Sequence, residues 1–168
     1  MRIYEGSPRQ DWEEVLRSVG AYLDDRGMRG LVFVETDNGF IVQGTCVSTT
    51  PGSAWGEAMG LLSCETLTIT DEQAAKFMDE ALARRGNEPD PGPKHYESQL
   101  RVLGRYFDEQ KPRDLFFFEI NGAYVARLTR QSQTGLKQEL VEFTAEDVAD
   151  MIAKAPALRR TPQQANRA

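Results

Sequence analysis

Residues 12–24 read WEEVLRSVGAYLD, and residues 96–108 read YESQLRVLGRYFD. The likeness extends without a gap from residues 12–45 to residues 96–129, at a constant offset of 84. Eleven of these 34 positions are identical, whereas ordinary composition gives roughly two. The identical pairs are Glu13/Glu97, Leu16/Leu100, Arg17/Arg101, Gly20/Gly104, Tyr22/Tyr106, Asp24/Asp108, Arg29/Arg113, Leu31/Leu115, Phe33/Phe117, Glu35/Glu119 and Thr45/Thr129. Chance does not account for this agreement, so the chain is predicted to be an internal duplication.

Both copies show the same succession of hydrophobic patterns. Apolar residues within 12–23 and within 96–107 recur at a spacing of 3.6, which predicts an amphipathic helix in each copy. Residues 31–35 and 115–120 each begin with successive apolar residues that run up to a glutamate, a pattern typical of central strands that are covered on both faces.

The rest of each copy predicts two more strands and a second helix. Asp37-Asn38 and Asn121-Gly122 occupy equivalent positions and suit two-residue hairpin turns. Further strands are expected at 40–47, 65–69, 123–131 and 138–143, and Thr70 and Thr144 cap the closing helices. The predicted fold class is therefore α+β, with two α-β-β-β-α units, antiparallel strands and an approximate two-fold between the copies.

The expected domain layout follows from the repeat. The first copy occupies residues 1–86, a linker rich in Pro and Gly occupies 87–94, and the second copy occupies 95–157. Residues 158–168 form a loose C-terminal tail. One core shared by both copies is expected, because so short a chain as one copy buries only a low fraction of its surface.

The first copy carries an insertion near 49–62, since the offset drops to 74 before the closing helix. This ten-residue excess is polar and rich in glycine, yet the segment holds Trp55, Met59 and Leu61. Loops held by a rigid scaffold often carry binding functions, so these three residues are candidate partner-binding residues. A segment that folds back over an exposed edge or an apolar face is an equally good interpretation.

The composition limits the classes of function. Hydrophobic residues make up 40% and charged residues 27%, which are globular values, and no apolar run approaches the roughly 20 residues of a membrane span. The N-terminus leaves no room for the apolar core of a signal peptide, so a cytoplasmic protein with no membrane contact is expected. A net charge of −6 disfavours nucleic acid as a partner. Two cysteines and one histidine leave no catalytic, metal or cofactor motif, and no cofactor is expected.

Recurring polar residues and glycines are the next candidates. Gly20 and Gly104 lie inside predicted helices, where glycine is costly, so a close approach to a neighbouring element is expected. Glu35 and Glu119 share a strand face with phenylalanines and therefore need partners. Arg29 and Arg113, or else Arg17 and Arg101, recur beside these carboxylates, and structural ion pairs are favoured over a paired-carboxylate active site. The run 116–118 is three phenylalanines and is interpreted mainly as core, with a base-stacking platform as the lesser alternative.

The cysteines are predicted to face each other. A three-residue loop at 133–135 sets Arg130 opposite Gln138, and the offsets of 84 and 74 carry these positions back to Cys46 and Cys64. The two thiols are expected to be free in a reducing compartment.

The function favoured by these patterns is a non-enzymatic cytoplasmic binding or adaptor protein that acts through protein–protein contacts. A protein partner is expected, and a homodimer is possible. The alternatives are a nucleic-acid-associated regulator and a small enzyme or ligand-binding domain with its site between the copies, near Glu35 and Glu119.

Overall fold

The computed structural model describes residues 11–47, 62–85 and 90–155, and in them the order helix, three strands, helix occurs twice. The first set is α2 (Trp12–Asp25), β1 (Arg29–Thr36), β2 (Gly39–Val47), β3 (Leu62–Thr70) and α4 (Asp71–Arg85). The second set is α5 (Tyr96–Gln110), β4 (Asp114–Ile120), β5 (Ala123–Ser132), β6 (Gly135–Phe143) and α6 (Ala145–Lys154). The α+β class predicted from the sequence is confirmed.

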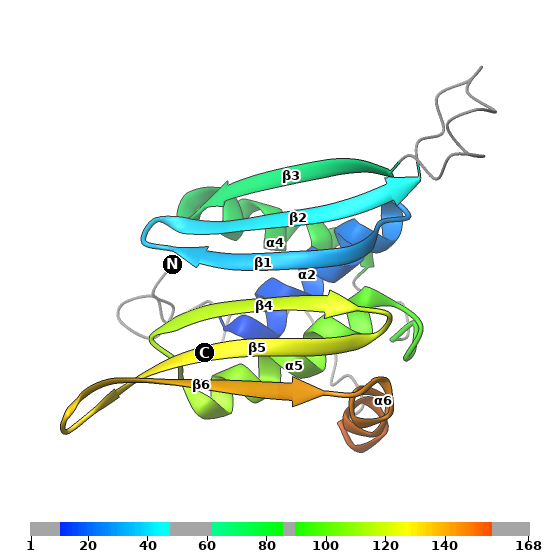
Figure 1. The fold of residues 1–168 in the computed structure, drawn as a ribbon. Coiled ribbons are helices and arrows are strands. Elements are labelled where there is room, and N and C mark those ends of the chain that lie inside the picture. Colours follow the sequence, from blue (N-terminus) through cyan, green and yellow to red (C-terminus); the bar gives the residue numbers. More distant parts are fainter. Residues whose placement is uncertain (1–10, 48–61, 86–89, 156–168) are drawn as a thin grey trace.

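The strands of the described residues belong to one antiparallel six-stranded sheet with the order β3-β2-β1-β4-β5-β6 (Figure 1). The prediction that β1 and β4 are central is confirmed. The hairpin turns expected after these two strands also form. Thr36 pairs with Gly39 and Ile120 with Ala123, which leaves two residues in each loop.

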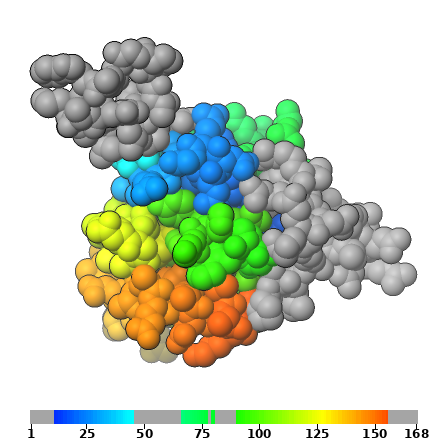
Figure 2. All heavy atoms as spheres, turned by 90° about the vertical axis from the view of Figure 1, so that its right-hand side faces the viewer, coloured from blue at the N-terminus to red at the C-terminus, as the bar shows by residue number. Residues whose placement is uncertain are grey.

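The four described helices lie on one face of this sheet (Figure 1). In the helix layer α2 packs against α5, α4 packs beside α2, and α6 packs beside α5. Figure 2 shows part of this succession at one end of the molecule, from blue through green to orange. The sequence pattern predicted cover on both faces of the central strands, and none of the described helices lies on the second face. Val32, Val34, Phe116 and Phe118 on the other face stay half-buried.

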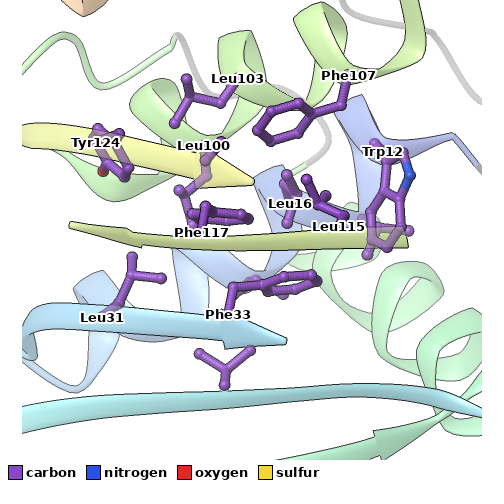
Figure 3. Close-up of a cluster of buried hydrophobic side chains, with 14 of the residues drawn as sticks. Trp12, Leu16, Leu31, Phe33, Leu100, Leu103, Phe107, Leu115, Phe117 and Tyr124 are labelled. Atoms are coloured by element: carbon purple, nitrogen blue, oxygen red, sulfur yellow. The ribbon is translucent and has the colours of Figure 1, made fainter. Parts of the chain in front are cut away.

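The hydrophobic core draws on both halves of the chain and is centred where β1 meets β4. Phe33 pairs with Phe117 in the sheet, and their rings stack with centroids 4.8 Å apart at an interplanar angle of 13°. Leu16 and Leu100 from the two central helices cover this stack, as Figure 3 shows. Trp12 packs edge-on against Phe33, with centroids 5.6 Å apart. Phe117 is therefore core, which agrees with the interpretation of the 116–118 run for this residue.

Each central helix is capped by the other. The Asp24 carboxylate at the end of α2 accepts hydrogen bonds from the backbone N–H groups of Tyr96 and Glu97, at 2.9 and 3.0 Å. The Asp108 carboxylate at the end of α5 accepts from the N–H groups of Trp12 and Glu13, also at 2.9 and 3.0 Å. These bonds satisfy N–H groups that a helix start otherwise leaves without partners.

Gly20 and Gly104 lie where the two helices touch, and both are buried. A Cβ atom at Gly20 would lie 2.4 Å from the carbonyl oxygen of Tyr96, and one at Gly104 would lie 2.3 Å from that of Trp12. The neighbours are backbone atoms, which cannot swing aside as the end of a side chain can. The predicted close approach at both glycines is confirmed.

The hairpin between β5 and β6 differs by one residue from the sequence-based expectation. Ser132 pairs with Gly135, so the loop holds two residues where three were expected. Arg130 therefore faces Lys137 in place of Gln138. In a hairpin the loop length fixes the register, so one residue fewer in the loop moves every facing pair by one.

The same shift overturns the prediction that Cys46 faces Cys64. Cys64 pairs with Thr45, and Cys46 belongs to the next pair along the strands. The alignment between the halves was not the source of this error. Thr129 pairs with Gln138 in the second half, and offsets of 84 and 74 carry that pair back to Thr45 and Cys64.

Candidate functional site

Glu35 and Glu119 lie at opposite ends of the β1–β4 contact. Glu119 is opposite Leu31, whereas the Glu35 carboxylate accepts a hydrogen bond from the Leu115 backbone N–H at 2.9 Å. Leu31 and Glu35 are four residues apart on one strand, a rise of about 13 Å. The stacked rings of Phe33 and Phe117 occupy the space between. The two carboxylates therefore do not converge on one position.

Glu119 belongs to a buried hydrogen-bond chain. Its side chain is 8% exposed and accepts bonds from the Tyr96 hydroxyl at 3.1 Å and the Gly122 N–H at 2.5 Å. The Tyr96 hydroxyl in turn accepts from the Gly30 N–H at 2.8 Å. Burial, followed by the negative charge of Glu119, raises the pKa of Tyr96 well above its ordinary value, so the hydroxyl stays a neutral donor.

Glu35 has a strongly shifted pKa. Burial, the largest cause, raises the pKa of this carboxyl from 4.5 to about 8, the hydrogen bond from Leu115 opposes the shift, and the nearby charge of Asp114 adds to it. Glu35 is consequently a group that takes up a proton near neutral pH. Its carboxylate lies where β1 meets β4, beside the Leu115 backbone N–H. A change in its protonation therefore changes the stability of the fold.

Arg29 and Arg113, the partners expected for these carboxylates, have exposed side chains. Glu119 is held by the Tyr96 and Gly122 bonds and not by the expected pair with Arg113, because the side chain faces the helices.

The other recurring arginines do form cross-helix ion pairs. Arg17 Nε lies 3.6 Å from Glu97 Oε1, and Arg101 Nη1 lies 3.4 Å from Glu13 Oε1. Arg101 is only 2% exposed and also binds the Asp90 carboxylate, at 3.1 Å through Nε and 2.9 Å through Nη2. These contacts join the helices and do not leave a charge free for chemistry.

The face of the sheet that no described helix covers carries a contiguous apolar surface, which we call the outer-face patch. It consists of the half-buried side chains of Val32, Val34, Ile41, Phe116, Phe118 and Val125. Cross-strand pairing joins them, because Val34 is opposite both Ile41 and Phe116, and Phe118 is opposite both Val32 and Val125. Residues that pair directly across strands share one face, so the six side chains form a continuous surface over the four inner strands.

Charged and polar groups surround the outer-face patch. The Arg127 guanidinium lies 5.2 Å from the centre of the Phe116 ring. Gln43 and Glu142 pair with Val32 and Val125 and are exposed. An apolar centre with a polar rim is the usual composition of a protein–protein contact.

Sequence reasoning did not find this patch. The run of successive apolar residues in β1 and β4 was its signal, but such a run has the same form whether the second face is covered by helices or left open. Phe116 and Phe118, expected mainly in the core, belong to the patch.

The candidate partner-binding residues Trp55, Met59 and Leu61 lie outside the described residues. The positions where their segment joins the sheet are described. Val47 at the end of β2 pairs with Leu62 at the start of β3, so both ends of the segment meet the sheet at one place.

His95 is the N-cap residue of α5, and its side chain makes no capping hydrogen bond. Its Nδ1 lies 3.9 Å from the Asp24 carboxylate, and the side chain is half exposed. This geometry agrees with a structural position at a helix start.

The described residues hold no group of three or more His, Cys, Asp or Glu side chains placed to bind a metal. None of the described helices is both long enough and apolar enough to cross a bilayer. Comparison with protein-family models, with curated proteins and with solved structures finds no significant match to this chain.

Proposed function

We propose that this chain is a non-enzymatic binding or adaptor protein that acts in the cytoplasm and contacts a protein partner through the outer-face patch. The observation that carries the proposal is the apolar centre of the sheet, where no described helix covers Val34, Phe116 or Phe118. Large contiguous apolar surfaces are uncommon on monomeric proteins and mark interaction sites. The half-buried aromatic rings of Phe116 and Phe118 would supply the anchors of such a contact.

We also propose that the two halves arose by duplication and are related by an approximate two-fold through the Phe33–Phe117 stack. Reciprocal contacts support this relation, because residues 84 positions apart make matching contacts between the two central helices. The aspartate caps, the close glycine contacts and the arginine ion pairs each occur once in either direction. The outer-face patch has the same property. Its equivalent pairs are Val32/Phe116, Val34/Phe118 and Ile41/Val125. A partner would then meet two similar half-surfaces, the second of which is the more aromatic.

The segment with Trp55, Met59 and Leu61 is proposed as a second contact for the same partner. The support is its attachment at the Val47–Leu62 pair, on β2, which contributes Ile41 to the patch, and on the neighbouring strand β3.

A nucleic-acid-associated regulator is the second candidate, and one observation favours it. Arg127 stacks over Phe116 on the open face of an antiparallel sheet, an arrangement that suits a base as well as a peptide. The net charge of −6 opposes this function, because phosphate binding needs a basic surface. The third candidate, an enzyme site near Glu35 and Glu119, has weaker support since the two carboxylates do not converge.

The test combines site-specific photo-crosslinking with reconstitution. A benzophenone side chain at Phe118 reports on the outer-face patch, and one at Lys76 on α4, whose side chain is 80% exposed, is the matched control. A protein crosslinked from position 118 but not from 76 in native cells is identified, purified and titrated against the chain. Val34→Asp should weaken that affinity at least about tenfold, because it places a charge in the apolar centre.

Three results would count against the proposal. Equal binding by Val34→Asp and the original chain would exclude the outer-face patch as the contact. Crosslinking from position 118 mainly to RNA or DNA, with binding that falls steeply as salt rises, would favour the second candidate. If Trp55→Ala loses binding and Val34→Asp binds as the original chain does, the contact would be assigned to the inserted segment.

A further inference from the structure

The edge of the sheet at β6 is a second surface, separate from the outer-face patch. β6 is an outermost strand, and its residues 136–140 are all exposed. Leu136 and Leu140 are 57% and 71% exposed, which places them among the most exposed large apolar side chains of the described residues. Because hydrogen-bonding direction alternates along an antiparallel strand, every second residue of β6 directs its N–H and C=O away from β5. Such an edge is a template for another strand.

The sequence of β6 is complementary to itself in one antiparallel register. When a second β6 is aligned about Gln138, Leu136 of each copy faces Leu140 of the other, and Lys137 of each faces Glu139 of the other. Two apolar pairs and two opposite-charge pairs form at once. Cross-strand pairs of these kinds are the interactions that stabilise antiparallel sheets.

The faces of the strand agree with this register. Leu140 is opposite Arg127, on the face that the described helices leave open, and Leu136 and Gln138 share that face by alternation. Lys137 and Glu139 belong to the helix side, where Glu139 also lies 3.6 Å from Arg130 Nη2. The paired leucines would therefore continue the outer, apolar face, and the charges would lie on the opposite face beside Arg130.

Neighbouring registers lack this complementarity. The helices of both copies lie on one side of a joined sheet only when facing residues come from the same face of β6. The residue numbers of each facing pair must then add up to an even number. Alignment about Lys137 sets Leu136 against Gln138, and alignment about Glu139 sets Leu136 against Glu142. Each of these pairs an apolar side chain with a polar one. The register about Gln138 is thus the one that the side chains select.

The other edge of the sheet gives an internal comparison. At the offset of 74 the equivalent register of β3 sets Leu62 against Thr66 and Ser63 against Glu65. No opposite charges meet there. We propose that two copies of this chain associate by antiparallel pairing of β6 with β6, which joins their sheets into one of twice the width.

The position of α6 leaves room for this association. α6 follows β6 and lies at the end of the strand remote from the β5–β6 loop (Figure 1). Gln138 lies nearer the loop end, three residues from Gly135 and five from Phe143. A contact made through one strand edge buries less than the roughly 1,600 Å² of a standard interface, so a reversible dimer in the micromolar range is expected.

The test is a charge exchange read out by sedimentation equilibrium. Lys137→Glu sets Glu against Glu in both pairs, and Glu139→Lys sets Lys against Lys, so each variant alone should raise the dimer dissociation constant about tenfold. An equimolar mixture of the two variants restores both opposite-charge pairs and should dimerise as the original chain does. The double variant K137E/E139K should also dimerise, while Lys76→Glu on α4 is the matched charge change that should have no effect.

The mixture separates pairing from misfolding, since a misfolded variant is not rescued by another. Circular dichroism of each variant checks the fold independently. A chain that stays monomeric up to about 0.5 mM would overturn the proposal, because an edge that weak has no role at cellular concentrations. So would a dimer unaffected by both single variants, or growth beyond the dimer, which would indicate β6 pairing with β3 of the next copy in an open chain.

Discussion

Asp24 and Asp108 cap each other's helices: the carboxylate at the end of α2 binds the start of α5, and that at the end of α5 binds the start of α2. The two helices are therefore antiparallel and locked at both ends. Each carboxylate accepts two backbone N–H groups from the neighbouring helix, a role that capping residues normally perform within their own helix.

Replacement of either aspartate should destabilise the fold by a similar amount. Asp24→Ala and Asp108→Ala each remove a charged acceptor from two first-turn N–H groups, and each should lower the free energy of unfolding by about 1 to 2 kcal/mol. Urea denaturation measures the loss, and Asp79→Ala on the exposed surface of α4 is the control. A loss at one aspartate only would show that the two caps are not equivalent in energy.

Gly20→Ala and Gly104→Ala should both destabilise, against the usual trend. In an exposed helix this change stabilises by up to about 1 kcal/mol, because alanine is the better helix former. Here the new methyl group meets a backbone carbonyl at 2.4 or 2.3 Å, so the helices must separate, at a cost on the order of 1 to 3 kcal/mol. Thermal and urea unfolding of both variants decide the sign. A more stable variant at either position would mean that the α2–α5 contact is looser than described.

Glu35 should make stability depend on pH. Its pKa in the folded chain is about 8 and its ordinary value is 4.5, so the native state holds the proton more tightly than the unfolded state. The contribution to stability is fully present below pH 4.5 and is lost as pH rises through 8, with a slope of at most about 1.4 kcal/mol per pH unit.

Glu35→Gln mimics the protonated carboxyl and should remove this part of the pH dependence. The variant should match the original chain near pH 5 and exceed its stability at pH 8. Urea midpoints at several pH values measure the difference, with Glu80→Gln on the exposed surface of α4 as the control. Parallel curves for Glu35→Gln and the original chain would contradict the assigned shift.

Arg101 should contribute far more to stability than its equivalent, Arg17. Arg101 is 2% exposed and binds Asp90, Glu13 and the backbone carbonyl of Ala155, the last at 2.6 Å. Arg101→Ala leaves these groups without their shared donor and should cost roughly 3 kcal/mol or more. Arg17→Ala breaks pairs of 3.6 Å at a more exposed position and should cost about 1 kcal/mol or less. Equal losses in urea denaturation would refute this ranking.

The local elements could be predicted because their signals are local. Apolar spacing gave both central helices, the dipeptides Asp37-Asn38 and Asn121-Gly122 gave two hairpin turns, and Thr144 gave the start of α6, where it forms a capping box with Asp147. Gly20 and Gly104 predicted a close contact because glycine is expensive in a helix unless its missing side chain is used.

The cross-strand register and the partners of individual side chains were harder to predict from the sequence. A hairpin loop of two residues and one of three are both compatible with Gln133-Thr134-Gly135, and that single residue decided whether Cys46 faces Cys64. The sequence pattern suggested Arg113 as a partner of Glu119, yet the Glu119 carboxylate accepts a hydrogen bond from the Tyr96 hydroxyl, because its side chain lies on the helix side of the sheet.

The sequence by itself determined the order of helices and strands and the pair of glycines at a helix contact, because these depend on spacing and on the conformational preferences of single residues. Only the tertiary structure decided that β1 pairs with β4, that every described helix lies on one face of the sheet, and that Val34, Phe116 and Phe118 are left at the surface. The physical reason is that apolar residues on both sides of a strand indicate that both faces avoid water. The pattern does not indicate which element covers each face. The covering of the second side depends on how distant elements pack, and in the described chain that packing leaves the centre of one face open.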